Sequence, residues 1–219
     1  RSGDSVMYVT LLGSLLAALW IGWAYDGLPL AIQAGTALLL PASLAYFLAR
    51  GRFASRIVLT TTNVAAVALH IQLGYGTIEY HFGVFVLLGM LMVYRDWRPL
   101  LLGAALFAVH HIGFDRMQAM GYAVYCTPRA NFLMVVLHAV YVVVQTGVEI
   151  VLARRLEIGT IEAAELAAIA RGVDRGERLD LDVRAFPATT PVSGLLQATM
   201  GKLATTIGEV EAASAAMAR

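Results

Sequence analysis

Successive apolar segments, each about long enough to cross a lipid bilayer, constrain this chain more than any other feature. A transmembrane helix needs roughly 17–25 consecutive and mainly apolar residues. Open strands are excluded in such segments, because lipid would leave their backbone groups without hydrogen-bond partners. We therefore predict an all-α membrane protein with six transmembrane helices. These are residues 6–24, 29–49, 57–75, 78–94, 99–115 and 131–153.

Composition agrees with a membrane protein and excludes other classes. Apolar residues make up 59% of the chain and charged residues 14%, a balance that soluble domains rarely have. The formal net charge is +1, so no basic surface is available to neutralise phosphates, and we expect no nucleic-acid partner. The single cysteine, Cys126, rules out an intramolecular disulfide. We interpret it as an ordinary buried residue, with a thiol ligand as the alternative.

The arginines predict how these helices are oriented. Positive residues favour the cytoplasmic side of a membrane. The outer connections carry only Arg116 and Arg129, whereas every inner connection carries at least two arginines. The inner set is Arg50, Arg52, Arg56, Arg95, Arg98, Arg154 and Arg155. We therefore expect a multi-pass membrane protein with both termini in the cytoplasm.

All five histidines fall within the apolar helices. Ionisable side chains at membrane depth are costly and are functional-site candidates by default. Counting about 1.5 Å per residue from the outer helix ends places them all within a band roughly 6–14 Å below the outer surface. Scattered structural histidines would not be expected to agree in depth. The predicted site therefore contains His70, His81, His110, His111 and His138.

The chemistry of imidazole favours a transition metal ion at this depth. Neutral imidazole binds Cu, Zn and Fe, and a protein site needs three or four ligands. Four helices can each supply one histidine around a common centre. Either His110 or His111 would serve, because neighbours on a helix point about 100° apart. Glu79 and Asp115 lie near His81 and His111 in sequence and could add carboxylate ligands.

Several alternatives stay open. A b-type haem held by two histidines suits the same helices, although five histidines and two carboxylates exceed what one haem needs. Without a cofactor, the histidines could sense external pH, since imidazole titrates near neutrality. For any one histidine alone, a hydrogen bond across a helix interface is the ordinary role. A histidine-rich membrane oxidoreductase is an alternative of another class, but we find no catalytic motif and expect no enzyme.

Residues 156–219 are predicted to form a soluble helix, an extended connector and a second helix. Pro187 and Pro191 exclude helix in the connector. The second helix carries an apolar seam at heptad spacing, which is typical of a coiled coil. The seam consists of Leu196, Met200, Leu203, Ile207 and Val210.

This arrangement, directly after a last membrane span, resembles a HAMP domain. The residues that reproduce the spacing at the start of that family's second helix are Gly194, Leu195, Leu196, Met200 and Leu203. The chain departs from the family at Val192, where a glutamate is usual. The resemblance implies a parallel four-helix bundle from two subunits, and hence a homodimer that passes conformational signals inward. It also implies an output module that follows residue 219.

The membrane part is similar to the polytopic sensory modules that precede HAMP in some bacterial methyl-accepting chemotaxis proteins. The similarity lies in Glu-Tyr-His-Phe at 79–82, Tyr-Arg-Asp-Trp-Arg at 94–98 and the His110–His111 pair. It implies a transmembrane receptor of the bacterial inner membrane but names no ligand. We therefore predict a sensor at residues 1–155 with a histidine-ligated metal near the periplasmic side. Residues 156–219 would relay its signal to a cytoplasmic signalling module.

Overall fold

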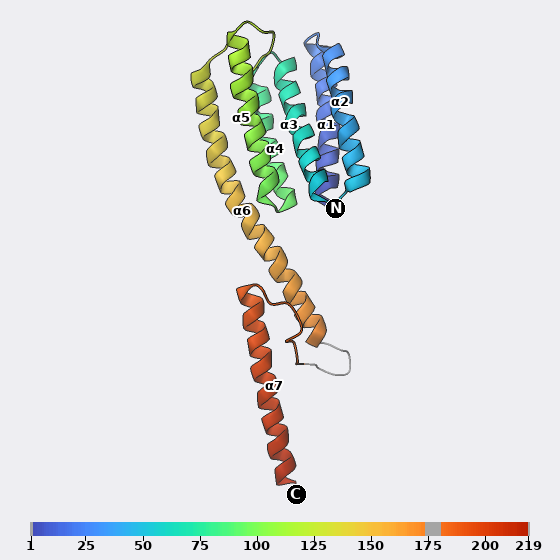
Figure 1. Ribbon diagram of the computed structural model, residues 1–219, viewed down its shortest axis with the longest axis vertical. Helices are drawn as coiled ribbons and strands as arrows, with labels where there is room; N and C mark the ends of the chain where they lie inside the picture. Colours follow the sequence, from blue (N-terminus) through green and yellow to red (C-terminus); the bar gives the residue numbers. More distant parts are fainter. Residues whose placement is uncertain (1, 174–180, 219) are drawn as a thin grey trace. The chain divides into compact units, whose positions relative to one another are not determined.

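The computed structural model describes residues 2–173 and 181–218, and every regular element in these ranges is a helix (Figure 1). The chain divides into two compact units, Arg1–Arg154 and Arg155–Arg219. Residues 174–180, which include part of the predicted connector, lie outside the described residues. The elements, with η marking 3₁₀ helices, are α1 (Ser2–Ala24), α2 (Leu28–Ala49), α3 (Phe53–Leu73), η1 (Ile78–His81), α4 (Phe82–Leu91), η2 (Met92–Tyr94), α5 (Trp97–Ala119), α6 (Phe132–Val173) and α7 (Pro191–Met217).

Five of these helices, α1, α2, α3, α5 and α6, are long and apolar enough to cross a membrane. The span predicted at residues 78–94 is shorter and consists of η1, α4 and η2. A 3₁₀ helix rises about 2.0 Å per residue, against about 1.5 Å in an α-helix. The segment therefore extends about 29 Å, close to the ~30 Å of a hydrocarbon core. Its length suits a sixth crossing.

Helices α1, α2, α5 and α6 each extend past at least one of the limits that apolar composition predicts, whereas α3 begins earlier, at Phe53, and ends earlier, at Leu73 instead of residue 75. Helix α5 begins at Trp97 rather than at residue 99, because Asp96 caps it by accepting a hydrogen bond from the backbone N–H of Arg98 (3.0 Å). Helix α6 continues past residue 153 to Val173 as a single helix. Apolar composition marks the part of a helix that lipid can cover, whereas helical hydrogen bonding continues into polar residues. Composition alone therefore underestimates helix length.

Helix α3 is the centre of the first unit. It lies between α1 and α2 on one side and α4 and α5 on the other (Figure 1). Buried polar groups tie it to its surroundings: Asn63 donates to the carbonyl of Met7 on α1 (3.1 Å), and Asp4 accepts from Ser55 (2.7 Å) and from the Gly51 N–H (2.6 Å). Such bonds between helices fix their register where apolar packing alone is non-directional.

In the second unit, a carboxylate of α6 binds the start of α7. Glu165 accepts hydrogen bonds from the backbone N–H groups of Thr189 (2.9 Å) and Thr190 (3.1 Å) and from the hydroxyls of Thr189, Thr190 and Ser193. N–H groups at a helix start lack intrahelical acceptors and favour a negative charge. These bonds, with the Ser193 and Thr189 hydroxyls contributing most, lower the pKa of Glu165 to about 2.

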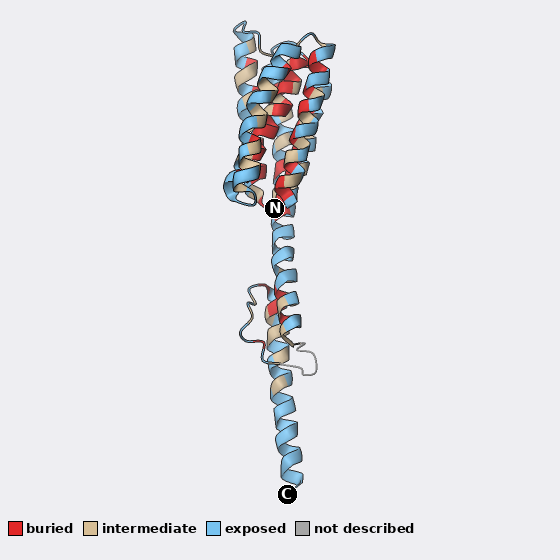
Figure 2. Cartoon of the chain, turned by 90° about the vertical axis from the view of Figure 1, so that its right-hand side faces the viewer, coloured by how far each residue is buried: buried red, intermediate tan, exposed pale blue. Residues whose placement is uncertain are grey.

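The seam predicted from heptad spacing lies on α7, which is exposed along most of its length (Figure 2). Leu203, Ile207 and Val210 are 45%, 42% and 63% exposed, and Leu196 and Met200 are half-buried. In the single chain, these apolar side chains therefore keep surface available to another molecule.

Candidate metal centre

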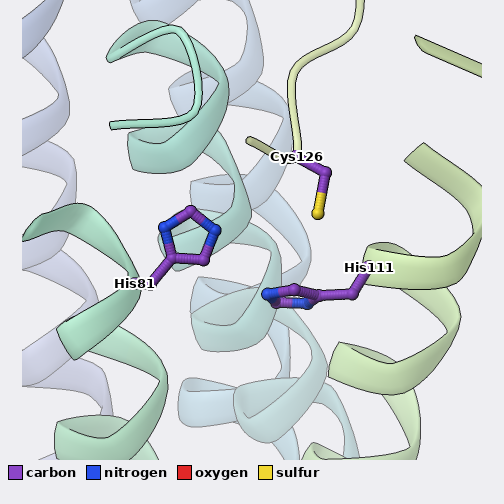
Figure 3. Close-up of side chains that lie close together, drawn as sticks. All are labelled: His81, His111 and Cys126. Carbon is purple, nitrogen blue, oxygen red and sulfur yellow. The ribbon is translucent and has the colours of Figure 1, made fainter. Parts of the chain in front are cut away.

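Two histidines and the cysteine lie together at the end of the first unit where α3 ends and η1 begins. His81 is the last residue of η1, His111 belongs to α5, and Cys126 lies in the loop between α5 and α6. One ligand atom from each side chain lies within 4.8 Å of the other two. All three side chains are buried, and Figure 3 shows them directed toward a common space. This arrangement could hold a metal ion.

Hydrogen bonds to the backbone define which ring nitrogen of each histidine is free. His81, His111 and their neighbour His138 each place Nδ1 against the carbonyl of the residue four positions earlier. The partners and distances are Thr77 (3.2 Å), Phe107 (2.9 Å) and Met134 (2.8 Å). A carbonyl can only accept, so these hydrogen bonds form in the tautomer that carries the proton on Nδ1. The lone pair of Nε2 is then available in each, the state that a metal requires.

The ring of His138 supplies a third imidazole beside the first two. Its centroid lies 5.4 Å from that of His81 and 6.5 Å from that of His111, while the His81 and His111 centroids are 5.4 Å apart. Two imidazoles on one tetrahedral ion, with metal–nitrogen distances of about 2.0 Å, have centroids roughly 5 Å apart. The spacing of the three rings is thus close to that of a three-histidine site.

The loop that carries Cys126 is held by glutamines from α3 and α5. Gln118 accepts from the Cys126 N–H (3.2 Å) and donates to the Thr127 carbonyl (2.8 Å). Gln72 accepts from the N–H of Tyr125 (2.8 Å). These contacts fix the backbone on both sides of the thiol, so its position is determined by the fold rather than by a helix of its own.

Burial raises the pKa of the Cys126 thiol to about 12, and the negative charge of Asp115 adds to the effect. At neutral pH the metal-free thiol is therefore protonated, and an ion that binds it must displace the proton. Sulfur and imidazole together suit Zn and Cu, whereas carboxylate-rich sites suit harder ions.

The other residues predicted for the site lie elsewhere or are engaged. The ring of His70 uses Nε2 to contact the Ser14 carbonyl on α1 (2.7 Å), which is a helix-interface role. Asp115 is fully buried and accepts from Arg116 and from the N–H of Asn131 (2.8 Å), so it fixes the start of α6. Glu79 is exposed.

The fifth histidine, His110, borders the cluster without joining it. Its ring lies against that of Phe114, with centroids 4.2 Å apart and planes tilted by 53°, and its centroid is 5.2 Å from that of His111. Its Nε2 is buried and has no hydrogen-bond partner among the described residues.

Cys126 was not among the residues predicted from the histidine band. A signal was nevertheless present in the sequence, because its loop joins two predicted helices that both carry histidines near their outer ends. A loop between such helices lies at the same end of the bundle as the rings.

A cavity of about 410 Å³ adjoins the cluster between α4, α5 and α6. Its walls include His81, His111 and His138. Beyond these rings the lining is almost entirely apolar, so the cluster forms the polar end of an apolar space.

Fold and site together define an all-helical protein with five helices of membrane-spanning length and, in the described residues, a histidine–cysteine cluster that could hold a metal ion. No family model, curated protein or solved structure matches the chain.

Proposed function

We propose that the chain is a transmembrane receptor that senses through a transition-metal centre held by His81, His111, His138 and Cys126. The observation that carries the proposal is the hydrogen bond that Nδ1 of each of the three rings makes to the backbone, which favours a free Nε2 lone pair in each ring, with His81 and His111 beside the Cys126 thiol. A histidine that binds a metal usually donates its other N–H to a carbonyl or carboxylate. A bound copper or iron ion would supply a redox change or an open position for a small ligand.

Helix α6 is the element that would transmit a change at this centre. His138 lies on it, and the same helix continues without interruption to Val173. Two hydrogen bonds hold α6. The N–H of Asn131, just before the helix, donates to the Asp115 carboxylate (2.8 Å), and the Gln145 side chain donates to the Phe85 carbonyl (3.2 Å). A change in the spacing of the rings would therefore displace α6 against these contacts, and the HAMP-like second unit would pass the displacement on.

The second unit would act as a homodimer. The partly exposed seam on α7, formed by Leu196, Met200, Leu203, Ile207 and Val210, supports this proposal, because a second copy would cover it in a coiled coil. The chain has a mass of 23.5 kDa. Light scattering with correction for bound detergent should give twice that protein mass, and a monomer at all concentrations would contradict the dimer.

Metal content measures the proposed function directly. The full chain, purified without added chelator, should contain about one Zn, Cu or Fe per subunit by elemental analysis. His81→Ala, His111→Ala, His138→Ala and Cys126→Ser should each lose most of it, because each removes one of the proposed ligands. His70→Ala is the matched control, since its ring contacts α1 instead, and it should keep the ion.

The absorption spectrum of the same samples separates the alternatives. A Soret band would show that the site binds b-type haem and not a metal ion. Haem is the second candidate, because an apolar cavity adjoins the three histidine rings. Neither metal nor haem in a protein that still signals would reject the centre and leave a sensor of external pH.

A further inference from the structure

The cavity beside the cluster suits a neutral ligand that dissolves in the membrane. Its volume of about 410 Å³ falls in the range of ~300–1,000 Å³ that is usual for small-molecule sites. Among the described residues, no acidic side chain, lysine or arginine lines it. Apart from His81, His111, His138, Thr146 and Gly147, the walls are aliphatic side chains, alanines and the rings of Phe85 and Phe107, which can stack on a planar ring.

One hydroxyl on the cavity wall is left without a partner among the described residues. Thr146 lines the cavity, is 5% exposed, and its buried Oγ1 makes no hydrogen bond within this part of the chain. Thr10, Thr36 and Thr62 each bond the carbonyl four residues earlier, as Thr36 does to Ile32 (2.8 Å), whereas Thr60, like Thr146, has a buried hydroxyl without a partner among the described residues but does not line the cavity. A buried hydroxyl without a partner is costly, so Thr146 offers a donor to whatever occupies the cavity.

The donor and the metal-ligand cluster lie at separate places along the cavity. Thr146 follows His138 by eight residues on α6, which corresponds to about 12 Å along the helix. A ligand bound to Thr146 therefore need not displace a metal ion from the rings, and its apolar part can extend between α6 and the α4–α5 pair.

We propose that this cavity binds a quinone, whose ring is planar and neutral and carries carbonyl acceptors. One carbonyl accepts from the Thr146 hydroxyl, and the apolar tail leaves toward lipid. A fatty acid fits less well, since its carboxylate would find no cation on the described walls. Binding itself requires no metal; the consequence for signalling, a bias on the position of α6, rests on the proposed receptor function.

Photolabelling of the purified full chain tests the site. An azido-benzoquinone with a decyl tail is the probe, and labelled peptides are mapped by mass spectrometry with and without excess decylubiquinone. Label should fall on cavity residues of α4, α5 and α6 and disappear under competition. Thr146→Val should weaken labelling about fivefold, and Ala108→Phe, which fills the cavity, about tenfold or more. The controls are Thr36→Val and Ala37→Phe on α2, which should label like the parent chain.

Each outcome decides one of the two proposals. Label outside the cavity, label that decylubiquinone does not compete, or a Soret band from haem in the cavity overturns quinone binding. Loss of labelling in Thr146→Val with unchanged metal content and unchanged helicity supports it. Normal competed labelling in a chain without metal supports quinone binding and rejects the metal centre. Because valine has the shape of threonine, the Thr146 variant tests the site even where Ala108→Phe fails to fold.

Discussion

Each imidazole of the cluster is oriented by the turn of its own chain that precedes it, whereas the thiol is positioned by distant parts of the fold. The Nδ1 bonds reach back four residues in all three rings. Cys126 instead depends on Gln118 and on the close approach of Gly76 to Thr127. At Gly76 the φ angle is +75°, and an added Cβ would lie 2.4 Å from the Thr127 carbonyl carbon. Of the candidate ligands, the thiol is therefore the one whose position is most sensitive to remote substitutions.

Gly76→Ala tests this dependence. The methyl group would meet backbone and the φ angle is unfavourable for alanine, so the loop should shift and the chain should lose about 1–3 kcal/mol of stability. Thermal unfolding in detergent and metal content are the measurements. Gly13→Ala is the control: its Cβ meets nothing within 4 Å, and alanine should be neutral or slightly stabilising there. Equal unfolding temperatures for the two variants would contradict the account.

Residue types and membrane depth were sufficient to name candidate ligands, but not to tell which of them lie in the cluster and which bond other parts of the fold. His70 and His81 look alike in sequence, yet packing of α3 against α1 places the His70 ring on the Ser14 carbonyl. Asp115 follows His111 by one helical turn, as a ligand could, but the N–H of Asn131 and Arg116 engage it. Such outcomes depend on which helices touch, and local spacing carries no information about that.

At the scale of elements, the contact between Glu165 and the start of α7 joins the two helices of the second unit. Heptad spacing predicts the helix of α7, but the prediction that Pro191 lies in the non-helical connector was wrong: it is the first residue of α7, where its missing N–H costs no hydrogen bond. The partner of its free N–H groups could not be predicted, because Glu165 is 24 residues away from Thr189 along the chain. The contact replaces a cap that the Thr190 side chain does not itself provide.

Glu165→Gln should loosen the start of α7. The pKa of Glu165 lies near 2, below its ordinary 4.5, so the carboxylate stabilises the fold above about pH 4.5 and loses this effect as pH falls toward 2. Hydrogen exchange of the Thr189 and Thr190 amides, normalised to intrinsic rates, should be faster in the variant at pH 7. In the parent chain, protection should decline across that acidic window. Glu157→Gln, exposed on the same helix, should exchange like the parent chain.

The long helices were predictable because each carries its own apolar run, whereas the ends of the short segment were not. Residues 78–94 contain an apolar run like the others, yet 3₁₀ geometry replaces α-helix at both ends. Its last turn closes on Arg95, which has a φ angle of +50°. The sequence there shows no glycine or asparagine that would indicate a left-handed residue.

At the scale of the whole molecule, the number of times that the chain crosses the membrane decides whether its two termini lie on the same side. Five crossings would separate the termini, and six would return them to one side. We expect six, because the segment 78–94 is about 29 Å long and because arginines gather at alternate connections.

Reporter fusions measure this directly. Alkaline phosphatase joined after Gly51 or after Arg219 should be inactive, since both positions are expected in the cytoplasm, and a fusion after Tyr122 should be active. Green fluorescent protein at the same positions is the complementary control. An inactive Tyr122 fusion together with an active Arg219 fusion would mean that 78–94 does not cross.

Because the ring of His138 bonds the backbone of α6, the proposed centre and that helix would be thermodynamically linked in both directions. If occupancy of the centre shifts α6, then holding α6 must change affinity at the centre by the same factor. Signalling partners that hold the cytoplasmic end of α6 would then change the ligand or metal concentration at which the centre is half-occupied. The threshold of such a receptor would belong to the assembled complex and not to its ligands alone.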